Sequence, residues 1–367
     1  MNLLKQWINT TRYVYNKSLQ ALKTEKDIKY NFMSLRNRFV TYKTKGKINK
    51  EINEWELETP KDVRAESIRD LIKAYNVCIT NLKRGNINKF KLSYRKKKSY
   101  PSIVIPKTAV SIENNTLYIY KTYINNDIKI SKDRCIEDLK IEYDCRVQYK
   151  NNNWYLIVPI KVKVKEKNEN KKGIVALDPG VKTFQTSYSE TESVKIQHDT
   201  ELIKKLNKKI DMFRSLRDKK MIKKKSYTRR SMKIYRRINN LIDELHFQTI
   251  NYLTKHHNWI LLPSFESQEM AMKGTNKRCN RDMMQLKHYM FKERLKSKCM
   301  LDKGTEIDIV TEEYTSKTCG LCGWINRLLR NDRIFKCKEC DVKIDRDING
   351  ARNILIKYIV WLIMNKK

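Results

Sequence analysis

The sequence lacks any apolar segment long enough to cross a membrane. Its longest apolar run, from Tyr358 to Met364, is far shorter than the roughly 20 residues that a membrane-spanning helix needs. Residues 1–11 have the pattern of an amphipathic helix, and no secretory signal opens the chain. With 9 glycines and 6 prolines, the chain has no linker rich in these residues, and it has no internal repeat. We therefore expect an intracellular, soluble protein with no membrane partner.

Acidic residues are also scarce. The 367 residues include 41 Asp and Glu against 79 Lys and Arg, so the formal net charge is +38. A small domain needs a net charge of only about 2 to 8 to stay soluble, so the excess indicates a polyanionic partner. Nucleic acid fits best, because phosphate contacts made by Lys and Arg release counterions and supply most non-specific affinity. The 40% apolar content excludes a disordered chain. The length favours two to three domains at roughly 150 residues each.

The pattern of apolar residues divides the chain into three parts. Residues 1–98 have helical periodicity, and residues 99–164 alternate in short runs that are typical of a small β-sheet or barrel. A charged connector follows at 161–172. From residue 173 onward, buried strands alternate with helices, which predicts an α/β layer. We expect the strands at 174–177, 259–262 and 306–310 and the helices at 202–221, 227–255 and 283–301.

The helical pair in the third part is strongly basic. Residues 201–240 include 16 Lys and Arg and 3 acidic residues, which is a charge of +13. Such a segment is either a solvated surface or a surface that contacts phosphates. The apolar residues of the first helix recur on one side and leave the basic residues opposite, which favours the phosphate-contacting surface.

Four of the nine cysteines have the spacing of a zinc site. Cys319, Cys322, Cys337 and Cys340 form two CxxC pairs, each of which can present two thiolates from a tight turn. With four protein ligands the ion has no open position, so we expect it to be structural. An odd number of cysteines argues against a secreted disulfide framework. The other five read as small apolar residues.

Catalysis must then come from carboxylates in the α/β part. Asp178 ends the strand at 174–177, Glu312 follows the strand at 306–310, and Asp347 opens the last helix. Two Mg²⁺ ions roughly 3.5–4 Å apart, held by such carboxylates, are suited to phosphodiester hydrolysis. Each residue also has a purely structural interpretation. Asp178 can cap a turn, Asp347 can cap a helix, and Glu312 can pair with a lysine.

Taken in order, several motifs resemble one family. They are Arg12-Tyr-Val-Tyr-Asn16, Trp154-Tyr-Leu-Ile-Val-Pro159, Leu177-Asp-Pro-Gly-Val-Lys-Thr-Phe184, Pro263-Ser-Phe-Glu266, Glu312-Glu-Tyr-Thr-Ser-Lys-Thr-Cys-Gly320, the two CxxC pairs and Arg346-Asp-Ile-Asn-Gly-Ala-Arg-Asn-Ile354. Together they resemble TnpB, the transposon-encoded nuclease, and especially its eukaryotic and giant-virus Fanzor relatives, which are related to type V CRISPR effectors. The resemblance runs over nearly the whole chain.

The resemblance implies a multidomain α+β protein with a RuvC nuclease domain, an RNase H-like α/β layer with three carboxylates. Carried over by motif, Asp178 is the first carboxylate and Asp347 is the last. The middle one is Glu312, with Glu266 and Glu313 as alternatives, because Pro263 occupies the position that much of TnpB gives to a glutamate. The implied cofactors are two catalytic Mg²⁺ ions, structural Zn²⁺ and a guide RNA. Target DNA is the second partner.

The implied domains follow the three parts of the chain. They are a helical recognition domain at 1–98, a β-barrel-like wedge at 99–170, a RuvC-like domain at 171–318 that contains the basic helical pair at 201–256, a zinc ribbon at 319–343 and a last RuvC segment at 344–367. Family members usually carry a β-strand before the first helix, and this sequence starts almost directly in that helix. We expect recognition of the motif beside the DNA target to be affected.

The implied function is RNA-guided, Mg²⁺-dependent cleavage of DNA next to a short flanking motif, in association with a transposon, with one protein per guide RNA. Two alternatives stay open. One is an inactive RNA-guided DNA-binding protein, and the other is a structure-specific nuclease that needs no guide. We expect a nuclear location if the source is a eukaryote or its virus.

Overall fold

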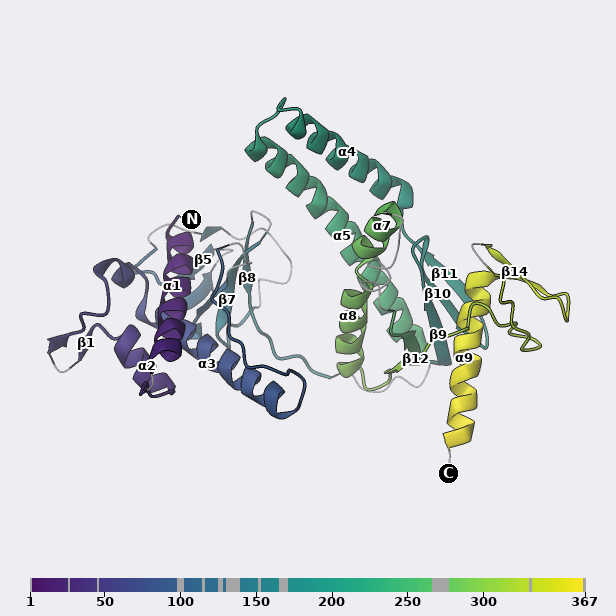
Figure 1. Cartoon of the computed structure of the whole chain (residues 1–367), viewed down its shortest axis with the longest axis horizontal. Coiled ribbons are helices and arrows are strands. Elements are labelled where there is room, and N and C mark those ends of the chain that lie inside the picture. The colour runs from purple at the N-terminus through teal and green to yellow at the C-terminus, as the bar shows by residue number, and fades with distance from the viewer. Residues whose placement is uncertain are drawn as a thin grey trace. The chain divides into compact units, whose positions relative to one another are not determined.

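A computed structural model describes most of the chain as two compact units, Met1–Lys161 and Val162–Lys367 (Figure 1). The described residues are 2–25, 27–44, 46–97, 102–113, 116–124, 128–129, 139–150, 153–164, 171–265, 277–329 and 332–365. None of the helices within these ranges is long and apolar enough to span a membrane. The division between the units, after Lys161, falls at the start of the charged connector that the sequence places at 161–172.

The first unit combines helices with two small sheets. Its helices are α1 (Asn2–Thr24), α2 (Phe32–Phe39) and α3 (Lys61–Lys83), with short 3-10 helices η1 (Glu54–Glu58) and η2 (Lys107–Ala109). Strands β1 (Lys43–Thr44) and β2 (Lys47–Ile48) pair in a hairpin. The remaining strands are β3 (Ser102–Ile105), β4 (Val110–Glu113), β5 (Thr116–Ile119), β6 (Ile128–Lys129), β7 (Cys145–Lys150) and β8 (Asn153–Ile157). Apart from the β1–β2 hairpin, these strands form two three-stranded antiparallel sheets, β3-β7-β8 and β4-β5-β6.

Helix α1 joins the helical and β-rich parts of this unit into one body. Its first half buries Leu4, Trp7 and Ile8 against apolar side chains of both sheets. Its second half buries Val14 and Ala21 against α2 and α3. One amphipathic helix therefore serves two cores.

The second unit is built on a five-stranded mixed sheet in the order β11-β10-β9-β12-β13. Strands β9 (Lys172–Pro179), β12 (His257–Pro263) and β13 (Glu306–Val310) run parallel, and β10 (Thr183–Ser189) and β11 (Ser193–Gln197) form an antiparallel extension. The helices are α4 (Thr200–Asp218), α5 (Lys224–His256), α7 (Lys277–Leu286), α8 (His288–Met300) and α9 (Arg346–Asn365). A hairpin of β14 (Ile334–Lys336) and β15 (Lys343–Asp345) precedes α9.

Helices cover both faces of the sheet. Alternate residues of β9 point to opposite faces. Val175 and Leu177 share a core with α4, α5 and α8, whereas Ala176 packs against Ile354 and Tyr358 of α9. The α/β layer expected from the sequence is thus present, although the sequence did not predict β10 and β11.

The helix expected at 283–301 is interrupted. Lys287 adopts a left-handed conformation with φ of 52°, which separates α7 from α8. Directly after the break, the buried rings of His288 and Phe291 pack against Phe184 of β10. The sequence has no glycine or proline at this position, so it did not predict the break that accompanies this tertiary packing.

Candidate active site and metal centre

Asp178 lies at the carboxyl end of β9, the middle strand of the sheet. Val175, Ala176 and Leu177 before it are fully buried, and Asp178 aligns with Thr186 of β10. The chain then turns at Gly180, where an added Cβ would lie 2.7 Å from the Thr183 carbonyl oxygen. The turn is too tight for a side chain there, so the carboxylate of Asp178 is held at the edge of the sheet.

Asp347 reaches the same edge from the first turn of α9. The carboxylate of Asp345 caps this helix by accepting hydrogen bonds from the backbone N–H groups of Asp347 at 3.1 Å and Ile348 at 3.3 Å. One turn further, Gly350 packs directly on Asp178. A Cβ at Gly350 would lie 2.6 Å from Oδ2 of Asp178. Only glycine lets the helix approach the carboxylate so closely.

Glu312 follows β13, and the parallel run of β9, β12 and β13 brings the end of β13 to the edge that carries Asp178. Its backbone carbonyl accepts hydrogen bonds from the N–H and hydroxyl of Thr315, at 3.3 and 2.8 Å. Glu312 is partly buried, whereas Glu313 is exposed. Glu266, the other alternative for the middle carboxylate, lies outside the described residues.

The electrostatics show that the three carboxylates share one site. Burial, together with the negative charges of Asp347 and Glu312, raises the pKa of Asp178 to about 8, against an opposing effect of Arg346. Burial also raises the pKa of Glu312. The structure therefore brings together Asp178, Glu312 and Asp347.

Three carboxylates with only oxygen donors suit hard divalent cations such as Mg²⁺. The high pKa of Asp178 fits this interpretation, because crowded carboxylates need a positive charge to ionise together. The donor type is therefore the one that a magnesium site requires, and the site itself stays a prediction. Within the described ranges, the oxygens of the three side chains are not all within 4.8 Å of one another.

The four cysteines form a separate cluster beside the hairpin of β14 and β15. All four sulfur atoms lie within 4.8 Å of one another, with Sγ–Sγ distances of 3.7 Å for Cys319–Cys340 and 3.5 Å for Cys322–Cys337. A tetrahedral zinc ion with Zn–S bonds of about 2.3 Å requires sulfur separations of about 3.8 Å. This geometry fits a closed structural zinc site.

Two buried asparagines of α9 connect the cysteine cluster to the carboxylates, and the sequence did not single them out. Asn349 accepts a hydrogen bond from the Gly320 N–H at 3.0 Å and donates to the Thr318 carbonyl at 2.7 Å. Asn353 donates to the carbonyls of Thr315 and Thr318, at 2.8 and 2.7 Å. The first cysteine turn and the segment after Glu312 are therefore anchored to the helix that carries Asp347. The i, i+4 spacing of two asparagines on one helix was the available signal.

The basic helical pair is α4 and α5, which extend from the sheet as a helical hairpin (Figure 1). Their apolar residues face the sheet and each other, with Ile203, Leu206, Ile210, Ile238 and Ile242 in the core. Most of the basic residues are left at the surface of the hairpin.

Comparisons with known proteins agree with this fold. The chain is 31% identical to A625R of Paramecium bursaria Chlorella virus 1, named as a transposase, over 97% of this chain and 83% of that protein. The chain belongs to the TnpB-like family of transposases. TnpB-like protein L770 of Acanthamoeba polyphaga mimivirus is 27% identical over 77% of this chain, which spans 54% of that protein. InsQ of Escherichia coli (strain K12), named as an RNA-guided DNA endonuclease, is 22% identical over 96% of this chain and 87% of that protein.

A family model described as "Cas12f1-like, TNB domain" matches residues 288–354 of this TnpB-like chain. That match includes Glu312, the four cysteines and Asp347. Among solved structures, the Cas12f1 chain of a complex with sgRNA and target DNA matches with a TM-score of 0.52 at 18% identity. The match covers 96% of this chain and 82% of that one, and it shows that the two share a fold. The multidomain α+β fold predicted from the sequence is thereby confirmed.

Proposed function

We propose that this TnpB-like protein is an RNA-guided, Mg²⁺-dependent DNA endonuclease associated with a transposon. The observation that carries the proposal is the grouping of Asp178, Glu312 and Asp347 at one edge of the sheet, in a chain with a net charge of +38. A group of carboxylates in so basic a protein suits a metal and a polyanionic substrate together. The names of InsQ and of the Cas12f1 complex support RNA guidance and a DNA target.

In this proposal each residue has a distinct role. Two Mg²⁺ ions, when bound, activate water and stabilise the leaving oxygen of the phosphodiester. Asp178 holds the central position from the rigid end of β9. Asp347 approaches from α9, with Gly350 allowing the close contact, and Glu312 closes the site from the segment anchored by Asn353. The four cysteines hold zinc and keep that segment in place.

The partners would divide between the parts of the chain. The helical residues 1–98 would hold the duplex of guide and target, and residues 99–170 would contact the RNA scaffold and the DNA beside the target. The nuclease segments 171–318 and 344–367 would cleave, with the ribbon at 319–343 contacting nucleic acid. The guide would supply the sequence specificity by base pairing.

The first experiment compares neighbouring glutamates. The protein is purified with its bound RNA, which is sequenced, and cleavage of a DNA matched to that RNA is measured in Mg²⁺. We expect Asp178→Ala and Glu312→Gln to abolish cleavage and the matched control Glu313→Gln to retain it. The opposite result for the two glutamates would overturn the assignment of Glu312.

The same preparation separates the alternatives. If protein stripped of RNA cuts DNA as fast as the loaded complex, guidance is not required and the guide-independent nuclease is correct. If the loaded wild-type complex binds its matched DNA and cuts nothing in Mg²⁺, the protein is an RNA-guided binding protein. Cleavage that depends on RNA, matched DNA and Asp178 supports the proposal.

A further inference from the structure

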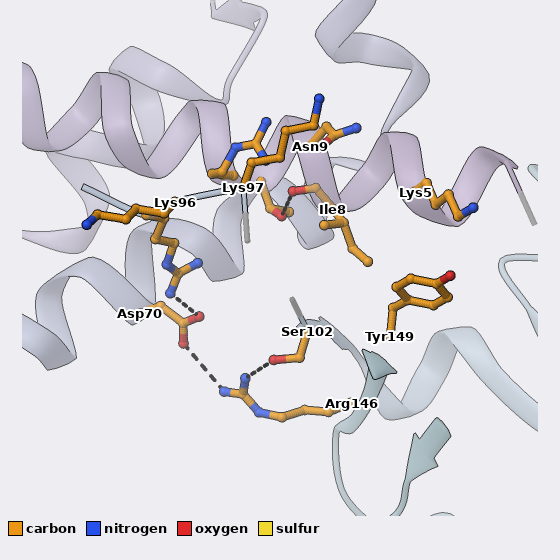
Figure 2. A pocket seen from close by; sticks show the side chains of 12 residues that line it. Lys5, Ile8, Asn9, Asp70, Lys96, Lys97, Ser102, Arg146 and Tyr149 are labelled. Atoms are coloured by element: carbon orange, nitrogen blue, oxygen red, sulfur yellow. Dashed lines mark hydrogen bonds and ion pairs between the residues drawn. The ribbon is translucent and has the colours of Figure 1, made fainter. Parts of the chain in front are cut away.

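A basic cavity lies in the first unit, within the residues 1–161 and apart from the carboxylate site. Its volume is about 400 Å³, within the range of roughly 300–1,000 Å³ that is usual for ligand pockets. It is lined by α1, α3, the segment 95–97, β3 and β7 (Figure 2). Six lining residues are cations and one is acidic. They are Lys5, Arg12, Arg95, Lys96, Lys97, Arg146 and the acid Asp70.

Asp70 organises the cavity by holding two arginines from distant parts of the chain. It accepts hydrogen bonds from Nη2 of Arg95 at 2.9 Å and Nη2 of Arg146 at 3.5 Å, as Figure 2 shows. Its side chain is only 18% exposed. Arg146 also donates from Nη1 to the hydroxyl of Ser102 at 3.3 Å. Because each guanidinium has five N–H donors, both arginines keep donors for a further acceptor.

The segment that carries Arg95 is itself clamped to α1. The side chain of Asn16 donates to the backbone carbonyl of Arg95 at 3.1 Å and accepts from its N–H at 2.8 Å. The guanidinium of Arg95 also lies 4.0 Å from the ring centroid of Tyr15. The position of this cation is therefore set before any ligand arrives.

Three other cations of the cavity have no acidic partner among the described residues. Within the described part of the chain, Lys5, Arg12 and Lys97 make no ion pair. The amine of Lys5 lies 5.3 Å from the ring centroid of Tyr149, next to it in Figure 2. An aromatic face beside cations is the combination that binds the base and backbone of single-stranded nucleic acid.

We propose that this cavity binds a backbone phosphate, with its nucleotide, of a single nucleic-acid strand. Two arginine forks held by one carboxylate match the geometry of a phosphate, which accepts paired N–H donors. The cavity is too small for a duplex. The inference rests on the proposed function only because it requires a nucleic-acid partner. It adds that one strand of this partner contacts the cavity of the first unit.

The test measures how salt weakens binding. The full chain, stripped of RNA, is titrated by fluorescence anisotropy with labelled oligouridine, with oligothymidine and with a DNA duplex, at several salt concentrations. Each phosphate contact to a single strand contributes about 0.7 to the slope of log affinity against log salt. We therefore expect the double variant Lys5→Gln, Arg12→Gln to flatten that slope by about 0.7 for a single strand, which corresponds to the loss of one phosphate contact.

The control removes the same charge elsewhere in the unit. Lys47→Gln with Arg84→Gln also replaces one lysine and one arginine, both exposed and outside the cavity. An equal flattening in this control, or none in the cavity variant, would overturn the proposal. A response to oligouridine alone identifies RNA as the strand, and a response to oligothymidine alone identifies DNA. A response to the duplex alone overturns the single-strand assignment.

Asp70→Asn tests the positioning of the arginines. The substitution removes one negative charge, so a merely electrostatic cavity would bind the probe more tightly. If Asp70 aligns Arg95 and Arg146, the variant binds more weakly. Tighter binding would refute this role.

If the variants fail to fold, the site can still be tested on the wild-type protein. Lysines are acetylated with and without oligouridine and read by mass spectrometry. We expect protection of Lys5 and Lys97 and none of Lys47, and equal rates at all three would refute the site. These experiments measure binding and do not depend on cleavage. If the cavity variants and the lysine protection show no effect while the protein still cuts DNA, only this inference is overturned. A responsive cavity in an inactive protein overturns the proposed nuclease alone.

Discussion

We expect Gly350→Ala to reduce the rate of DNA cleavage while it changes the stability of the protein only slightly. In the interior of a helix, alanine is more stable than glycine by about 0.8–1.0 kcal/mol, so propensity alone makes this substitution stabilising. Here the new Cβ would lie 2.6 Å from Oδ2 of Asp178 and 3.3 Å from its Cγ. Ordinary contact begins near 3.4 Å, so the carboxylate oxygen must move by about 0.8 Å. A displacement of about 1 Å in a catalytic group costs on the order of 100-fold in rate.

The assay is single-turnover cleavage of matched DNA by the RNA-loaded protein, with urea denaturation of the same variants. We expect cleavage to fall by about 100-fold, while the free energy of unfolding changes by less than about 1 kcal/mol. The control Lys357→Ala, on an exposed position of α9, should cut at the wild-type rate.

A double-mutant cycle isolates the clash. In an Asp178→Ala background, the alanine at position 350 meets no carboxylate, so the substitution should stabilise the protein by about 1 kcal/mol. In the wild-type background the gain should be smaller or reversed. Full cleavage by Gly350→Ala, or equal stability changes in the two backgrounds, would refute the contact between α9 and Asp178.

Three further predictions concern the surroundings of the site. His246 is buried and its pKa is lowered to about 4, so only the unfolded chain takes up a proton near pH 6.5 and stability is lost as the pH falls. Between pH 7 and 5 the wild type should lose about 2 kcal/mol more than His246→Gln in urea denaturation, and equal losses would contradict the burial of a neutral ring. Cys337→Ser should reduce bound zinc from about one equivalent to almost none by elemental analysis, whereas Cys299→Ser should keep it; zinc retained by the first variant would rule out the four-sulfur site. Asn353→Ala removes one buried and one partly buried hydrogen bond to backbone carbonyls and should cost about 2 kcal/mol in stability. It should also slow cleavage, unlike the exposed Asn365→Ala; an unimpaired cleavage rate would show that the anchor does not position Glu312.

Features that depend on residues close together in the chain could be predicted from the sequence. The strand at 174–177 is a continuous apolar run, and β9 forms there because such a run is buried on both faces of a sheet. The structure confirms the four-cysteine cluster. It could be predicted because each CxxC turn places two sulfurs together regardless of the rest of the fold. By contrast, β10 is rich in polar residues that are nevertheless buried, such as Gln185 and Thr186, so composition did not reveal it.

The sequence by itself determined the charge, the zinc spacing and the occurrence of carboxylates at strand ends, because each of these follows from residue identity or short spacing. Only the tertiary structure decided which carboxylates meet. Asp178, Glu312 and Asp347 are far apart in the chain and converge because β9, β12 and β13 run parallel and α9 packs on β9. The contact of Gly350, the anchoring by Asn353 and the cavity around Asp70 have the same origin. They depend on spatial distances between segments that are far apart in the chain. Hydrophobic packing determines these distances, and the local sequence does not reveal them.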